Sequence, residues 1–206
     1  MTDVSVIMPA RNAARTIAQS VASVLAQDNL LELIVVDDGS TDTTAAVVRA
    51  VADPRLRVIA GPQAGIAAAL NAGVAAARGD LIARCDADDL FTPGRLAHQC
   101  GVLAARPAYV AVAGGFITMD AAGRDLAHLA CDGPARDVTA ALRAGIPQSH
   151  LCAWLIRRTA YTATGGARPW FQTAEDIDLQ YRLSDQGPVW HDPQPVYRYR
   201  LHDTSI

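Results

Sequence analysis

The sequence of 206 residues predicts an α/β fold with a mostly parallel central sheet and helices on both faces. Two observations carry this prediction. Short apolar runs alternate four times with segments of helical periodicity in a little over a hundred residues. These runs are almost unbroken by polar residues, which is typical of strands that are covered on both faces of a parallel sheet.

Each of the four apolar runs in the first half is expected to be a strand that leads into a helix. Residues with good capping chemistry precede the helical segments, and Pro93 suits the first turn of the last one. The strands are expected at 4–8, 31–36, 57–60 and 81–85, and the helices after Asn12, from Ser40 or Thr41, over 66–77 and after Thr92-Pro93.

The second half is less regular and is expected to extend the same sheet. Thr173-x-x-Asp176 resembles a capping box and is expected to open the last helix, which runs to about Ser184. Strands are expected at 109–116, 117–120, 149–156 and 196–201, and a further helix at 135–144.

Composition limits the classes of function. The net charge of −3 does not favour binding to nucleic acid. No apolar run is long enough to predict a membrane-spanning helix. The N-terminus lacks the pattern of a signal peptide, so we expect a cytoplasmic protein. All 18 basic residues are arginine, which excludes a P-loop lysine or a Schiff-base lysine. Any bound phosphate must therefore be held by arginine, a metal ion or backbone N–H groups.

Acidic residues follow two of the predicted strands. Asp37 and Asp38 end the second strand, whereas Asp86, Asp88 and Asp89 follow the fourth. The carboxyl ends of parallel strands meet at one edge of the sheet, where ligands bind in α/β proteins. Clustered carboxylates there indicate a divalent cation, Mn2+ or Mg2+, that is shared with a substrate phosphate. The alternative is that these residues form solvated turns and helix caps.

Several motifs, in order, resemble those of glycosyltransferase family 2. They are Val-Ser-Val-Ile-Met-Pro-Ala-Arg-Asn, Val-Val-Asp-Asp-Gly-Ser-Thr-Asp, Ala-Leu-Asn-Ala-Gly, Ala-Arg-Cys-Asp-Ala-Asp-Asp, Pro-Gly-Arg-Leu, Ala-Glu-Asp-Ile-Asp-Leu and Tyr-Arg-Leu-His. The resemblance extends from Val4 to Ser205. It implies one GT-A domain over residues 1–206, with a nucleotide-sugar-binding half to about 106 and an acceptor-binding half from about 107.

The resemblance also implies roles for individual residues. Asp88 matches the second aspartate of an Asp-x-Asp motif and would be the principal metal ligand, with Asp86 and, less directly, His202 as further ligands. Asp176 matches the catalytic base and Glu175 stands beside it. The residues expected to contact the nucleotide sugar are Pro9, Ala10, Arg11, Asn12, Asp38, Asn71, Arg84, Asp86 and Ala87.

The function implied is an inverting, metal-dependent transfer of a single sugar from a nucleoside diphosphate sugar to a hydroxyl group, in glycan or polysaccharide biosynthesis. The Gln-x-x-Arg-Trp motif of processive synthases is absent. Arg11 and Leu70 depart from the commoner family pattern and leave the donor base open. A subset of the family has leucine at the position of Leu70 together with an arginine before the Asp-x-Asp motif, as Arg84 is here. The acceptor pocket is expected around His150, and His150 itself is expected to be structural.

The acceptor can be a saccharide, a lipid-linked molecule or a small molecule. A lipid-linked acceptor would place the protein at the inner membrane surface. A homodimer is also compatible with the sequence. One alternative is a binding module that holds the nucleotide sugar without turnover. The other is a sugar-phosphate nucleotidyltransferase, which the absence of a glycine-rich N-terminal loop and of lysine disfavours.

Overall fold

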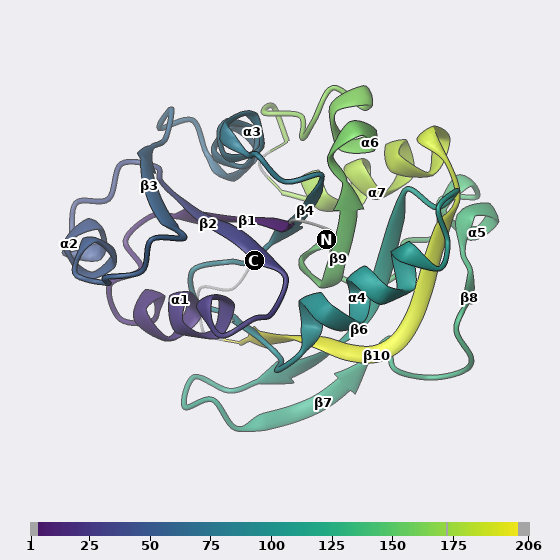
Figure 1. Cartoon of the computed structure of the whole chain (residues 1–206), viewed down its shortest axis with the longest axis horizontal. Helices are drawn as coiled ribbons and strands as arrows, with labels where there is room; N and C mark the ends of the chain where they lie inside the picture. Colours follow the sequence, from purple (N-terminus) through teal and green to yellow (C-terminus); the bar gives the residue numbers. More distant parts are fainter. Residues whose placement is uncertain (1–3, 172, 202–206) are drawn as a thin grey trace.

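The computed structural model describes residues 4–171 and 173–201, and a ten-stranded sheet runs through this part of the chain (Figure 1). The strand order is β3-β2-β1-β4-β9-β6-β10-β5, with β7 paired to β6 and β8 paired to β10. The strands are β1 Val4–Ala10, β2 Leu30–Asp37, β3 Leu56–Ala60, β4 Leu81–Arg84, β5 Leu90–Phe91, β6 Ala111–Met119, β7 Asp125–Leu129, β8 Arg136–Asp137, β9 Trp154–Arg157 and β10 Val189–Arg200.

Strands β3, β2, β1 and β4 are parallel, as the sequence predicts. The second half is mixed, because β9 is antiparallel to both of its neighbours, β4 and β6, whereas β10 is parallel to β6. The helices are α1 Ile17–Leu25, α2 Thr44–Arg49, α3 Ile66–Ala76, α4 Arg95–Ala104, α5 Thr139–Arg143, α6 Arg158–Ala163 and α7 Glu175–Gln186, with a 3-10 turn η1 at Leu151–Ala153.

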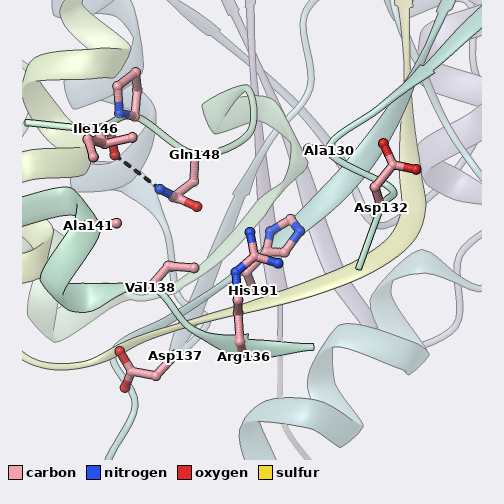
Figure 2. Close-up of a pocket in the computed structure, with 10 residues that line it drawn as sticks. Ala130, Asp132, Arg136, Asp137, Val138, Ala141, Ile146, Gln148 and His191 are labelled. Atoms are coloured by element: carbon pink, nitrogen blue, oxygen red, sulfur yellow. Dashed lines mark hydrogen bonds between the residues drawn. The ribbon is translucent and has the colours of Figure 1, made fainter. Parts of the chain in front are cut away.

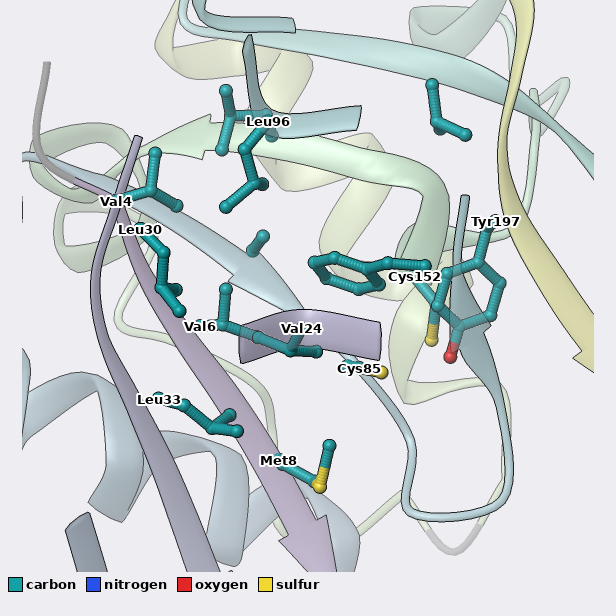
Figure 3. Close-up of a cluster of buried hydrophobic side chains, with 14 of the residues drawn as sticks. Val4, Val6, Met8, Val24, Leu30, Leu33, Cys85, Leu96, Cys152 and Tyr197 are labelled. Atoms are coloured by element: carbon teal, nitrogen blue, oxygen red, sulfur yellow. The ribbon is translucent and has the colours of Figure 1, made fainter. Parts of the chain in front are cut away.

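The side chains of β1 alternate between two buried clusters, one on each face of the sheet. Val4, Val6 and Met8 join a cluster with α1 and α4, and Figure 3 shows part of it around Leu33. Ile7 faces the other way, into a cluster formed with α3, α6 and α7. Successive strand residues point to opposite faces, so a strand that is apolar throughout needs helices on both sides. The predicted two-sided covering is confirmed.

Four predicted helix caps are wrong. Helix α2 begins at Thr44 and not at Ser40 or Thr41, and α4 begins at Arg95 after Gly94, in both cases without a side-chain cap. Helix α1 begins at Ile17 and not after Asn12, whose backbone has a φ of 53° and whose Oδ1 accepts a hydrogen bond from the amide of Thr41. Helix α7 begins at Glu175 after Ala174, and no side chain caps it. The side chains of Asn12 and Glu175 bond instead to another loop and to the end of another strand, respectively.

Apart from the short strand β5, which the sequence analysis does not predict, the remaining differences lie in the second half. The strands expected at 109–116 and 117–120 are one strand, β6, and the helix expected at 135–144 is the short β8 followed by α5. The strand expected at 149–156 is η1 followed by β9, and α6 follows it where a loop is expected.

The last strand starts at Val189 rather than 196. Pro193 and Pro195 lie where its pairing with β6 shifts register, and prolines inside a strand are found at such irregularities. Because of these prolines, the sequence pattern does not predict the first part of β10.

None of the described helices has the length and the apolar stretch needed to cross a bilayer. The longest of them, α7, has 12 residues.

Candidate active site

A cleft of about 1030 Å3 opens at the carboxyl ends of β1, β2 and β4, and the start of α7 lines it as well. This is the edge at which the sequence places the two acidic groups. The cleft brings together eleven residues that the sequence analysis selects: Pro9, Ala10, Arg11, Asn12, Asp38, Arg84, Asp86, Ala87, Asp88, Glu175 and Asp176.

Two residues of the predicted site are not among those that line the cleft. Asn71 lies in α3, where its Oδ1 accepts hydrogen bonds from the hydroxyl of Tyr161 (2.7 Å) and the amide of Ala167 (2.9 Å). Its Nδ2 donates to the carbonyl of Ala167 at 2.6 Å. The structure therefore places the Asn71 amide in contact with the 161–167 segment. His202 lies outside the described residues.

The loop after β1 is held by the acidic turn after β2. The amide of Asn12 donates to Oγ of Ser40 at 3.1 Å, and the amide of Ala13 donates to Oγ1 of Thr44 at 2.8 Å. Asp42 accepts hydrogen bonds from the amide and the hydroxyl of Thr44. This segment thus forms the turn that the sequence analysis gives as an alternative, and the turn shapes one wall of the cleft.

Asp38 is buried at the base of the same wall. Its Oδ1 accepts a hydrogen bond from the amide of Gln63 at 2.6 Å, and its Oδ2 accepts one from the amide of Gly65 at 3.0 Å. Gly61 lies so close that a Cβ there would be 2.6 Å from Oδ1 of Asp38. The carboxylate therefore fixes the segment that leads into α3 while it borders the cleft.

Arg84, the last residue of β4, binds the carboxylate of Asp86 through two parallel hydrogen bonds. Nε lies 2.6 Å from Oδ1, and the terminal Nη2 lies 2.9 Å from Oδ2. Burial by itself would raise the pKa of Asp86, but the charge and hydrogen bonds of Arg84 hold the pKa of this carboxyl below its ordinary value. Asp86 is therefore ionised at neutral pH.

Asp89 differs from the other two acids of its cluster because it does not line the cleft. It is 1% exposed, and its carboxyl group accepts hydrogen bonds from the hydroxyl of Tyr197 (2.8 Å) and the amide of Arg200 (2.6 Å). Burial, with Asp86 and Asp88 nearby, raises the pKa of Asp89 to about 8. Asp89 joins β10 to the loop after β4.

Asp86 and Asp88 are the two carboxylates of this loop that border the cleft. Within residues 4–171 and 173–201, no three His, Cys, Asp or Glu side chains form a group that could hold a metal ion. Mg2+ is commonly held by one or two carboxylates together with substrate phosphates and water. Asp86 and Asp88 can therefore bind a cation whose other ligands are diphosphate oxygens and water, and they do not form a complete set of protein ligands.

Asp176 lies at the start of α7, and His150 is its neighbour in the cleft. The Nδ1 atom of His150 accepts a hydrogen bond from the amide of Cys152 at 3.4 Å, so the ring proton of the neutral imidazole lies on Nε2. Burial and the charge of Arg84 lower the pKa of His150 in spite of the carboxylates of Asp86 and Asp176. The ring lies against that of Tyr199, with 5.1 Å between the centroids.

The cleft includes residues to which the sequence analysis gives no role. Arg15 follows β1, and Tyr199 and Arg200 end β10. The Nε atom of Arg200 donates to the carbonyl of Asp88 at 2.8 Å, which places its guanidinium against the acidic loop. The signal that could locate Tyr199 and Arg200 is the parallel pairing of β10 with β6, since the end of β10 reaches the same edge. That pairing cannot be read from the sequence.

A second, smaller pocket of about 550 Å3 contains none of the predicted site residues (Figure 2). It is bordered by the 146–148 segment, where Gln148 donates a hydrogen bond to the carbonyl of Ile146, and by His191 and Arg136, which are register partners in β10 and β8.

Residues 5–164 match the family model described as glycosyl transferase family 2. The chain belongs to glycosyltransferase family 2. The chain is 36% identical over 209 residues to EpsE of Bacillus subtilis (strain 168), which carries the name of a glycosyltransferase; the match covers 98% of this chain and 73% of EpsE.

A second relative is the succinoglycan biosynthesis protein ExoU of Rhizobium meliloti (strain 1021). It is 44% identical over 130 residues, which are 62% of this chain and 37% of ExoU. The chain thus corresponds to less than half of ExoU.

The fold matches that of S. aureus TarS, solved as residues 1–349 in complex with UDP and with UDP-GlcNAc. The TM-score is 0.81 in each case at 18% identity, over 97% and 98% of this chain and 60% of TarS 1–349. At this identity the likeness shows the fold, and the predicted GT-A architecture is confirmed.

Proposed function

We propose that this family 2 chain transfers a single sugar from a nucleoside diphosphate sugar to a hydroxyl group, with inversion at the anomeric carbon and with Mn2+ or Mg2+. The observation that carries the proposal is the cleft itself. It holds the Asp86 and Asp88 carboxylates and the Asp176 carboxylate, which come from distant parts of the sequence. Asp86 and Asp88 can bind a metal ion that is shared with a diphosphate, and Asp176 can act as a general base.

The cleft is bordered by several positively charged side chains that can bind the phosphates of a donor. Arg11, Arg15 and Arg200 border it, and they are the kind of phosphate ligand that a chain without lysine must use. Asp88 and Asp86 would hold the divalent ion, which supplies positive charge to the leaving diphosphate when bound. The complexes of TarS with UDP and UDP-GlcNAc support a nucleotide-sugar donor for this fold.

Asp176 is assigned the role of general base. An ionised carboxylate at this position can accept the proton of an acceptor hydroxyl as that oxygen attacks the sugar. A single displacement from the face opposite the leaving group inverts the configuration. The name of ExoU supports a role in polysaccharide biosynthesis.

The deciding experiment is a thermal-shift panel of nucleoside diphosphates and their sugars. Each is tested with Mn2+, with Mg2+ and with EDTA, on wild type, on Asp88→Ala and on Asp80→Ala, whose side chain is 91% exposed and serves as the control. The correct donor at about 100 times its Kd stabilises the protein by about 2.7 kcal/mol. We expect one nucleotide to shift wild type and Asp80→Ala only with metal, and not to shift Asp88→Ala.

Turnover is measured next with the donor so identified. Release of the nucleoside diphosphate is followed with panels of saccharide, lipid-linked and small hydroxyl acceptors. Metal-dependent binding without release on any acceptor would contradict catalysis and favour a binding module. The absence of a shift with every nucleotide would contradict the donor site as a whole.

A further inference from the structure

The guanidinium of Arg84 joins two acidic residues that come from distant parts of the chain. In addition to the two hydrogen bonds with Asp86, Nη1 of Arg84 lies 3.0 Å from Oε1 of Glu175. Both Arg84 and Glu175 are 7% exposed. Three of the five N–H donors of the arginine are therefore engaged by two carboxylates, in a geometry that a planar fork can meet and an ammonium cannot.

Glu175 is the first residue of α7 and directly precedes Asp176. The residue before it, Ala174, has a φ of 63°, and no side chain caps the helix. The contacts that hold the later turns of α7 include those of Gln180 with Ser149 and of Arg143 with Ser184. The bond from Arg84 thus ties the first turn of α7 to the end of β4, at the residue next to Asp176.

We infer that Arg84 is a positioning residue, and that its bridge between Asp86 and Glu175 sets where Asp176 stands relative to the donor. This inference deepens the proposed function and rests on it. It adds to the expectation that Arg84 contacts the nucleotide sugar, since Arg84 also borders the cleft. Without the bridge, the loop with Asp86 and the start of α7 with Asp176 are both still present, but their relative position is no longer fixed. A displacement of about 1 Å between reacting groups can lower the rate about 100-fold.

A double-mutant cycle tests the bridge. The variants are Arg84→Gln, Glu175→Gln and the pair together, and the readouts are kcat and the Kd of the donor nucleotide. We expect Glu175→Gln to lower kcat about 10- to 100-fold while the donor Kd stays within about twofold. The double variant should be no slower than the slower single variant, because both changes remove the same bridge.

The matched control is Arg55→Gln. Arg55 also binds a nearby carboxylate, that of Asp53, and a backbone carbonyl, but it lies before β3 and does not line the cleft. Its loss should leave kcat unchanged. If Arg84→Gln does not fold, Arg84→Lys takes its place, and we expect it to lose kcat to a similar degree because lysine cannot hold both carboxylates.

Three results would overturn the inference. The first is a loss of kcat in the double variant that equals the product of the losses in the two single variants. The second is an unchanged kcat in Glu175→Gln. The third is a raised donor Kd in Glu175→Gln with kcat intact, which would mean that Glu175 contacts the donor directly.

Failure of the proposed function is seen separately, as a wild type without turnover. The bridge is then tested by hydrogen exchange of the amides at 175–178. This exchange should rise in Glu175→Gln and not in Arg55→Gln, and unchanged exchange would overturn the bridge.

Discussion

The Nε2 atom of His150 lies 3.9 Å from Oδ2 of Asp176, within the cleft that also holds Asp86. With Nδ1 occupied by the amide of Cys152, the neutral ring presents its N–H at Nε2. The sequence analysis expects His150 to be structural, and its bond with the amide of Cys152 is a contact of that kind, while its Nε2 faces Asp176 across the cleft.

Asp176→Asn should lower kcat by about 100- to 10,000-fold, because the amide cannot accept the proton of the acceptor hydroxyl. The donor Kd should change little, since Asp176 acts on the acceptor side. Asp185→Asn is the control, as this residue is exposed in the same helix. Equal rates for the two variants, measured by nucleotide release, would remove Asp176 from the mechanism.

Asn71→Ala should destabilise the fold and spare donor binding. The variant removes three hydrogen bonds, those of Asn71 with the carbonyl and the amide of Ala167 and with the hydroxyl of Tyr161, which costs about 1–3 kcal/mol because the Ala167 carbonyl loses its Asn71 donor. In a chain of this size each kcal/mol lowers Tm by about 2–4 °C. Calorimetry and nucleotide titration check both statements. A weakened donor Kd with an unchanged Tm would contradict this and support the donor contact that the family resemblance implies.

Gly73→Ala should destabilise the protein although alanine favours helices. A Cβ at Gly73 in α3 would lie 2.3 Å from Cγ2 of Ile7 in β1, and the branched side chain cannot swing away. Overpacking of this kind costs about 1–3 kcal/mol. Gly101→Ala in α4 meets nothing within 4 Å and should stabilise by about 0.5–1 kcal/mol. Denaturant unfolding of the two variants should give opposite signs.

His191 should make the protein less stable in acid. It is 2% exposed, and burial, with Arg136 beside it, lowers its pKa in the folded state. The unfolded chain takes up the proton first, near pH 6.5, so stability is complete above about 6.5 and falls as pH drops towards the folded pKa. His191→Gln should flatten the fall of the unfolding free energy between pH 7 and 5, by at most about 1.4 kcal/mol per pH unit. An identical pH profile in both proteins would contradict this.

The first half of the fold and the position of the cleft could be predicted from the sequence because their determinants are local. Apolar runs such as 81–85 specify buried strands, and the parallel order then brings Asp38 and Asp86 to one edge without further information. The family motifs add Asp176, and the family itself is confirmed by the match over residues 5–164.

Other features were decided by tertiary contacts, since they join residues that the sequence keeps far apart. The reversal of β9, the full length of β10 and the burial of Asp89 under Tyr197 depend on strand pairing, which local patterns do not encode. Asn71 and Arg84 are the clearest cases. The sequence by itself determined their chemical capacity to bind a polar partner, whereas packing decided that the partners are Ala167 and Glu175, because buried polar groups must bond to whatever the fold brings beside them.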